Sequence, residues 1–189
     1  MKQIIVLFFL VTGVPVGALA QGERVVSLIH NDVYELNGGV RSSMGGRSRI
    51  VLPVDIPFNT KMLIYAVTAK RPGEAIESNF DFALAVGTLL ATGNLALSTA
   101  ASRVEIPAGT QTVEVNLIPT RPESQHFLLK NDNLWRRYPD YSREACQSCQ
   151  VAIPFSYSLP NPFFIGIKNP SALNPVVVVI NVVAIVREY

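Results

Sequence analysis

Short apolar segments separated by turn-forming residues recur along most of this sequence. The clearest of them alternates, because Val113, Val115 and Leu117 fall on one side of an extended chain and their polar neighbours on the other. This alternation is typical of a half-solvated strand in an antiparallel sheet. The pattern predicts nine strands, at residues 32–36, 48–54, 61–69, 102–106, 112–118, 126–129, 149–156, 163–167 and 176–186.

The last apolar run, residues 176–186, contains seven valines among eleven residues. It is too short for a membrane-spanning helix, and the stiff valine side chain favours an extended strand. We therefore expect a long strand that is buried on both faces. The run 163–167 is bounded by Asn161-Pro162 and Asn169-Pro170, which predicts a hairpin with the last strand through a loop over 169–175.

One segment departs from the strand pattern. Residues 80–91 are rich in alanine and leucine, with Ser78 or Asn79 as an N-cap, Asp81 in the first turn and Gly93 beyond the end. These features predict a single helix. Many strands with one helix between them favour an all-β fold, an antiparallel, jelly-roll-like β-sandwich with one inserted short helix.

The first twenty residues have the pattern of a secretory signal. Lys2 precedes an apolar core over residues 4–16, and Ala18-Leu19-Ala20 supplies the small residues at which a signal peptidase cuts. The core is shorter than the roughly twenty residues that a spanning helix needs, which argues against an uncleaved anchor. We expect residues 1–20 to be a signal peptide that is cleaved near Ala20. Residues 21–189 then form a single exported domain, periplasmic or extracellular, with no membrane span.

The charge balance narrows the choice of partners. The chain has 16 basic and 14 acidic residues, and losing Lys2 with the signal peptide leaves a net charge of +1. This is too balanced for an electrostatic grip on nucleic acid, so we expect no nucleic-acid partner. The glycine pairs Gly38-Gly39 and Gly45-Gly46 do not form a phosphate-binding loop, and we expect no cofactor.

Two segments, residues 49–69 and 163–185, carry a family resemblance. Pro57-Phe58-Asn59-Thr60 leads into one predicted strand, and Gly166-Ile167-Lys168-Asn169 ends the strand before the last one. In both respects the chain resembles the small jelly-roll domains of the GOLD and bacterial pre-peptidase C-terminal kinds. The resemblance covers about a quarter of the chain. It implies a non-catalytic module that binds proteins, lipids or glycans or assists secretion, and it carries over no site residue.

The two cysteines form the motif Cys146-Gln147-Ser148-Cys149. In an exported chain with no other cysteine, a structural disulfide between Cys146 and Cys149 is the leading interpretation. A thiol-disulfide redox protein is the alternative, although that chemistry needs the first thiol at a helix N-terminus. A zinc site would require two more ligands, and the chain offers only His30 and His126, so we expect no metal.

Residues 131–143 are the best candidate interaction surface. The segment places aromatic rings beside guanidinium groups between two predicted strands, a composition that binding hot spots favour. Its candidate contact residues are Trp135, Arg136, Arg137, Tyr138, Tyr141 and Arg143. In the simpler interpretation Trp135 only covers the core and the arginines stay solvated. Asn131-Asp132-Asn133 lacks the glycine and the glutamate of a calcium loop.

No catalytic motif is present: the sequence contains neither Gly-x-Ser-x-Gly nor His-Glu-x-x-His. We therefore expect a non-catalytic binding or assembly module of the bacterial cell envelope or secretome, with a protein or glycan partner. The alternatives are a redox protein that uses Cys146 and Cys149, and a carbohydrate-binding module that uses Trp135, Tyr138 and Tyr141.

Overall fold

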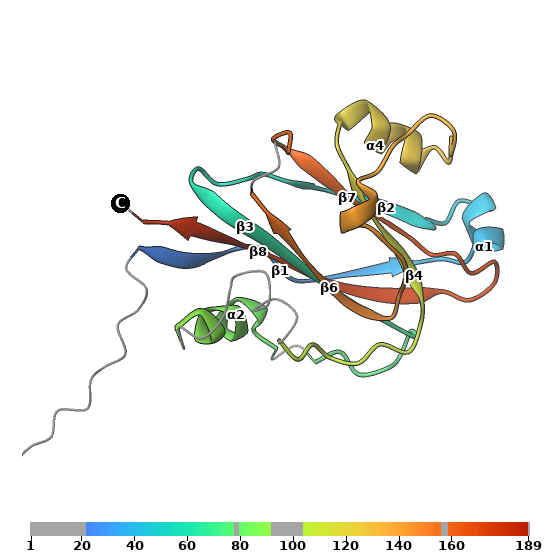
Figure 1. Ribbon diagram of the computed structural model, residues 1–189. Helices are drawn as coiled ribbons and strands as arrows, with labels where there is room; N and C mark the ends of the chain where they lie inside the picture. The colour runs from blue at the N-terminus through green and yellow to red at the C-terminus, as the bar shows by residue number, and fades with distance from the viewer. Residues whose placement is uncertain (1–21, 78–79, 92–103, 156–158, 189) are drawn as a thin grey trace, which may run out of the picture.

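The computed structural model describes residues 22–77, 80–91, 104–155 and 159–188, and within them it is a sandwich of two antiparallel sheets. The first sheet, sheet A, has the strand order β1-β8-β3-β6, and the second, sheet B, has the order β2-β7-β4-β5. Figure 1 shows the strands of both sheets running along the length of the molecule. The predicted all-β, antiparallel sandwich with a small helix is confirmed.

The strands of the two sheets are mixed along the chain. Sheet A consists of β1 (Glu23–Leu36), β3 (Thr60–Lys70), β6 (Ser148–Pro154) and β8 (Val176–Arg187). Sheet B consists of β2 (Arg49–Val54), β4 (Val113–Ile118), β5 (Arg143–Cys146) and β7 (Phe163–Lys168). Every paired strand is antiparallel to its neighbour.

The main core lies between the two sheets, where side chains of the strands in one sheet meet those of the other. Sheet A supplies residues such as Tyr65 and Ile180, and sheet B supplies residues such as Ile165. The alternation of Val113, Val115 and Leu117 is confirmed, since all three belong to this core. The last strand, β8, is buried on both faces as predicted, because a helix covers its outer side.

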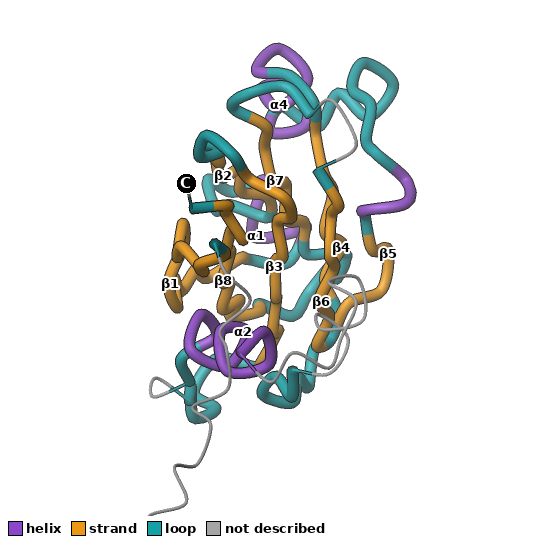
Figure 2. The backbone as a smooth tube through the Cα atoms, turned by 60° about the vertical axis from the view of Figure 1, so that its left-hand side comes forward, coloured by secondary structure: helices purple, strands orange, loops and turns teal. Residues whose placement is uncertain are grey.

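Two helices cover the outer faces of the sandwich. Helix α2 (Phe82–Ala91) packs Phe82 and Val86 on sheet A, and α4 (Arg121–Leu128) packs Phe127 on sheet B. Figure 2 shows these two helices far apart on the molecule. The short helix α1 (Gly39–Ser43) connects β1 to β2, and a 3-10 turn, η2 (Pro139–Tyr141), precedes β5.

The predicted helix over 80–91 is confirmed as α2, which begins at Phe82. The proposed caps Ser78 and Asn79 and the terminal Gly93 lie outside the described residues. Asp81 supplies a cap, because its Oδ1 accepts a hydrogen bond from the Leu84 N–H at 2.9 Å.

The predicted strand over 126–129 is wrong, because these residues form the end of α4 and its C-cap. The apolar sequence Phe127-Leu128-Leu129 suggested a strand, whereas the helix begins upstream among polar residues. Thr120 Oγ1 accepts a hydrogen bond from the Glu123 N–H at 3.4 Å, and Pro122 lies in the first turn. This is a standard helix start, which fixes the conformation of the apolar residues that follow.

The predicted hairpin of residues 163–167 with 176–186 is also wrong. The two segments form β7 and β8, which belong to different sheets, so the loop between them crosses the sandwich. The Asn169 side chain holds this crossing: Nδ2 donates to the Asn174 carbonyl at 2.8 Å, and Oδ1 accepts from the Ser171 N–H at 2.9 Å.

Three further segments differ from prediction. Strand β1 begins at Glu23 and not at residue 32, because two irregularities in its pairing with β8 hide the alternation. Strand β5 has only four residues and was not predicted. Val104, Glu105 and Ile106 of the predicted strand 102–106 are not in a strand, and residues 102–103 lie outside the described part.

The predicted signal peptide lies outside the described residues as well. Among the residues that the structure describes, no helix is both long and apolar enough to cross a membrane.

Candidate functional site

The predicted interaction segment, residues 131–143, follows α4 and leads along sheet B to β5. Three hydrogen bonds fix its second half. The Tyr138 N–H donates to the Leu117 carbonyl at 2.9 Å, and the Leu117 N–H donates to Ser142 Oγ at 3.0 Å. From sheet A, the Tyr65 hydroxyl donates to the Tyr141 carbonyl at 2.6 Å. The segment is therefore a fixed part of the sandwich.

Tyr65 makes this anchor from within the core. Its side chain is 1% exposed, and burial raises the pKa of its hydroxyl well above the usual range, with Arg143 acting weakly in the opposite direction. The hydroxyl therefore stays protonated and remains a donor to the Tyr141 carbonyl.

An open groove of about 610 Å³ lies between this segment and the outer face of sheet B. We call it the Trp135 groove. It is lined by residues from β4, β5, β7 and the segment after α4, namely Glu114, Asp132, Trp135, Arg137, Glu144 and Lys168. All but Trp135 are charged.

The charges of the Trp135 groove are joined in pairs. Glu114 and Lys168 are opposite each other on β4 and β7, and Lys168 Nζ lies 3.0 Å from Glu114 Oε1. Arg137 forms an ion pair with Glu144. Because each carboxylate has a cationic neighbour, the groove offers many donors and acceptors with little net charge.

The third carboxylate, Asp132, is held by Arg49. The guanidinium makes two parallel bonds, with Nη1 at 2.7 Å from Asp132 Oδ1 and Nη2 at 3.0 Å from Oδ2. Arg49 is buried, and its Nη1 also donates to the Phe127 carbonyl at 2.8 Å. These hydrogen bonds from Arg49, with a smaller contribution from the Trp135 N–H, lower the pKa of the Asp132 carboxyl.

Trp135 is half-buried at the end of the groove. Its ring meets the Phe127 ring edge to face, with centroids 5.0 Å apart, and its Nε1–H donates to Asp132 Oδ1 at 3.3 Å. Phe127 in turn lies against the backbone of β7 at Gly166, where a Cβ would be 3.0 Å from Phe127 Cε1 and 2.7 Å from Ile118 Cδ1. The missing side chain of Gly166 therefore allows α4 to approach sheet B.

A buried amide beside the groove has an unused donor. Asn116 is fully buried on β4, and its Oδ1 accepts a hydrogen bond from Arg137 Nη1 at 3.1 Å. Its Nδ2 has no hydrogen-bond partner among the described residues. An unpaired buried N–H₂ group costs folding free energy.

The structure divides the predicted contact residues. Trp135 and Arg137 line the groove, and Arg136 is exposed next to them. Tyr138 and Tyr141 pack against the main core. Arg143 donates through Nη1 to the carbonyls of Asp140 and Ser142, at 3.1 and 2.7 Å.

The sequence interpretation missed the groove residues Glu114 and Lys168 and the buried Asn116 beside them. A signal for two of them was present, because the strand alternation that turns Val113 and Val115 inward also turns Glu114 and Asn116 outward together. In sequence, Asp132 stands out only as part of Asn131-Asp132-Asn133, which does not match a calcium loop. Its carboxylate instead bonds Arg49, which lies 83 residues away in sequence.

Cys146 and Cys149 are joined by a disulfide. Cys146 ends β5 in sheet B, and Cys149 lies near the start of β6 in sheet A, so the bond closes the turn that crosses between the sheets. Both cysteines lie on strands, and neither is placed at the N-terminus of any helix that the structure describes.

The two histidines lie on opposite layers, His30 on β1 and His126 on α4. Within the described ranges, no group of three or more histidine, cysteine, aspartate or glutamate residues is arranged to hold a metal ion.

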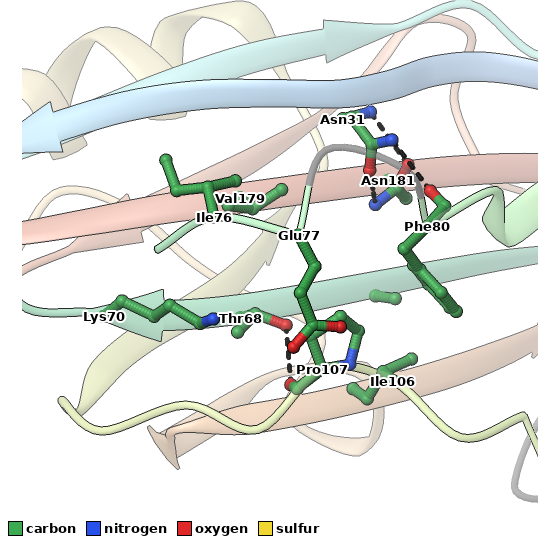
Figure 3. Close-up of a pocket in the computed structure, with 11 residues that line it drawn as sticks. Asn31, Thr68, Lys70, Ile76, Glu77, Phe80, Ile106, Pro107, Val179 and Asn181 are labelled. Atoms are coloured by element: carbon green, nitrogen blue, oxygen red, sulfur yellow. Dashed lines mark hydrogen bonds between the residues drawn. The ribbon is translucent and has the colours of Figure 1, made fainter. Parts of the chain in front are cut away.

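A smaller hollow lies on the outer face of sheet A, and its lining includes Ile76, Glu77, Phe80, Ile106 and Pro107 (Figure 3). Its floor includes a pair of asparagines: the Asn31 N–H donates to Asn181 Oδ1 at 2.8 Å, and Asn181 Nδ2 donates to Asn31 Oδ1 at 3.0 Å. Asn31 Nδ2 also donates to the Phe80 carbonyl at 2.8 Å, which ties the approach to α2 onto β1. The cavity holds about 20 Å³, room for about one water molecule. We assign it a structural role.

The resemblance of residues 49–69 and 163–185 to GOLD-like and pre-peptidase C-terminal domains stays a prediction. No family model matches this chain, and a comparison with curated proteins finds no match.

Proposed function

We propose that this protein is an exported, non-catalytic binding or assembly module of the bacterial envelope or secretome, and that the Trp135 groove binds its partner. One observation carries the proposal: an aromatic ring and the carboxylates of three ion pairs meet around one open groove on the face of a sheet. A preorganised surface of this kind binds without a large loss of conformational entropy.

The chemistry of the groove favours recognition over catalysis. A catalytic carboxylate or base needs a pKa near the working pH. The pKa of Asp132 is instead lowered, and Glu114 and Glu144 are each bonded to a cation. The lowered pKa keeps the Asp132 carboxylate ionised at neutral pH, where it serves as a fixed hydrogen-bond acceptor.

Site-specific photo-crosslinking in cells tests this proposal. A photoreactive residue replaces Arg136, which is exposed beside the groove, and a matched control replaces Arg71 on the loop after β3. We expect a recurrent adduct from position 136 that position 71 does not give. Equal labelling of abundant envelope proteins from both positions would contradict a partner at this groove.

A glycan is a second candidate ligand, favoured by the neutralised charges and by the Trp135 ring. Sugar hydroxyls both donate and accept hydrogen bonds, and flat aromatic side chains stack on sugar rings. Glycan-array binding that is lost in Trp135→Ala and retained in Trp135→Phe would support this ligand class. Near-UV circular dichroism must show that the Ala variant keeps its fold, since Trp135 also packs on Phe127.

A thiol-disulfide enzyme remains the alternative from another class. The strand positions of Cys146 and Cys149 do not support it, because none of the described helices begins at either cysteine to stabilise a thiolate. Catalysis of insulin reduction by the mature protein would overturn the non-catalytic assignment.

A further inference from the structure

A second groove, of about 520 Å³, lies beside β2 between α1 and the end of α4. We call it the β2-edge groove. Arg47, Arg49 and Lys130 line it together with the hydroxyl-bearing residues Tyr34, Ser42 and Ser48, and none of the described residues that line it is acidic. It is separate from the Trp135 groove, because the Arg49–Asp132 pair stands between them, with Arg49 lining one groove and Asp132 the other.

The wall of this groove is an open sheet edge. Strand β2 is the outermost strand of sheet B, paired only with β7 among the described strands. The consecutive residues Arg49, Ile50, Val51 and Leu52 all line the groove, although Ile50 and Leu52 belong to the core between the sheets. Successive residues of a strand point to opposite faces of the sheet. They can all line one groove only if the groove runs along the edge of the strand.

The hydrogen bonds identify which backbone groups point outward. Ser48 faces β7, because its carbonyl accepts from the Asn169 N–H at 2.9 Å. Arg47 faces the other way, since its carbonyl accepts from the Asn37 N–H at 2.7 Å. Alternation along an antiparallel strand then directs the N–H and C=O groups of Arg49 and Val51 away from β7. Pro53 is the next residue in this series. It has no N–H, so the row of outward-facing backbone donors ends there.

Two of the three cationic side chains at the groove are not neutralised within the described part of the chain. Arg47 is exposed and belongs to none of the ion pairs found there. Lys130 has a positive φ of 62° just after α4, and its Nζ donates to the uncharged Ser42 Oγ at 2.7 Å. Asp32 does not line the groove, and its Oδ2 accepts a hydrogen bond from the Tyr34 hydroxyl at 3.0 Å. The groove therefore carries a net positive charge.

We infer that the β2-edge groove binds an extended acidic segment of a partner protein, which adds to sheet B as a short strand along β2. The backbone of the segment pairs with Arg49 and Val51, and its carboxylates lie near Arg47 and Lys130. Main-chain pairing at a sheet edge supplies affinity, and the flanking charges select the sequence. Because Pro53 lacks a donor, the pairing is short.

The test uses the mature protein and a labelled, terminally blocked eight-residue peptide that alternates valine with glutamate. Two control peptides carry glutamine or lysine in place of glutamate. Fluorescence anisotropy at physiological salt measures binding. We expect the glutamate peptide to bind at least tenfold more tightly than either control. Binding of the glutamine peptide with equal affinity, or no binding of the glutamate peptide at millimolar protein, would overturn the inference.

Charge variants locate the site. Arg47→Glu and Lys130→Glu should each weaken binding of the glutamate peptide about tenfold. The matched control is Arg41→Glu, an exposed residue of α1 that does not line the groove and that changes the net charge equally. Equal weakening by all three variants would indicate a general charge effect and contradict the site.

Amide exchange separates strand addition from simple anion binding without a variant. The Arg49 and Val51 amide protons should exchange with solvent at least tenfold more slowly in the peptide complex than in the unbound protein. Inorganic phosphate at the same ionic strength should not displace the peptide. Unchanged exchange at both amides, or displacement by phosphate, would overturn the pairing.

Discussion

At the scale of single residues, Arg49 shows how this fold places a charge on a sheet face that a helix covers. Its guanidinium lies 5.1 Å from the centroid of the Phe127 ring, and it bonds both the Phe127 carbonyl and the Asp132 carboxylate. The buried cation is thus hydrogen-bonded, paired and in contact with a π-face. Sequence could not predict this arrangement, because both partners come from a segment about eighty residues away.

Acid should weaken the contribution of Asp132 to stability. An unfolded aspartate titrates near pH 3.9, and Arg49 lowers the pKa in the folded protein. The stabilisation is therefore complete above about pH 4 and is lost as the pH falls through the lowered folded-state pKa. We expect Asp132→Asn to reduce the free energy of unfolding at pH 7 and to have a smaller effect at about pH 2. Urea unfolding at both pH values measures this, and an equal effect at both would contradict it.

Gly166 should not tolerate a methyl group. In Gly166→Ala the new Cβ would approach Ile118 Cδ1 to 2.7 Å and the Phe127 ring to 3.0 Å, so these two buried side chains must move. We expect a loss of about 1–3 kcal/mol in the free energy of unfolding, by urea denaturation. The matched control is Gly87→Ala in α2, where the nearest atom is 3.8 Å away. That change should stabilise by up to about 1 kcal/mol, and a similar loss in both variants would argue against the packing explanation.

At the scale of elements, sequence predicted best those strands that combine apolar, β-branched residues with a clear turn at each end. Five strands fall close to their predicted ranges for this reason: β2, β3, β4, β7 and β8. Sheet membership was not predictable in the same way. β7 and β8 are buried on both faces, so neither has a polar side to show which sheet it joins.

Helix α4 depends on its N-cap, the signal that the strand prediction overlooked. Thr120→Ala removes the side-chain oxygen that accepts the Glu123 N–H, and it should lower the free energy of unfolding by about 0.5–2 kcal/mol. Thr88→Ala in the interior of α2 is the control, because alanine is the better helix former there. Chemical denaturation checks both, and an unchanged stability of Thr120→Ala would mean that packing alone sets this helix.

The Cys146–Cys149 disulfide should make a modest contribution. The chain-entropy model gives about 2 kcal/mol for so short a loop. We expect the double variant with alanine at both positions to fold and to lose about that amount in urea denaturation. Failure to fold would instead show that the crossing between the sheets depends on the covalent bond.

At the scale of the whole molecule, each sheet has one outer face covered by a helix, and the two proposed binding grooves flank the helix on sheet B. The sandwich followed from sequence because a sheet with one apolar face must bury it against another layer. The two grooves could not be predicted from sequence. Each is lined by residues from at least three elements, which only the complete topology brings together.

Export is also a property of the whole chain. If residues 1–20 are a signal peptide, the full-length chain expressed in a bacterium should be recovered outside the cytoplasm with Gln21 as its first residue. N-terminal sequencing and intact mass measure this. A recovered chain that still begins at Met1 would contradict cleavage.

The central position of β8 has a consequence for the order of events during synthesis. This strand pairs with β1 on one side and β3 on the other, and Arg187 lies opposite Glu23, so the two ends of the described chain meet in one sheet. A ribosome makes β1 and β3 long before β8, and until then neither strand has its central partner. Sheet A is therefore completed only after translation of residues 176–187. If residues 1–20 direct export, this delay would keep the chain unfolded enough to thread through a translocation channel.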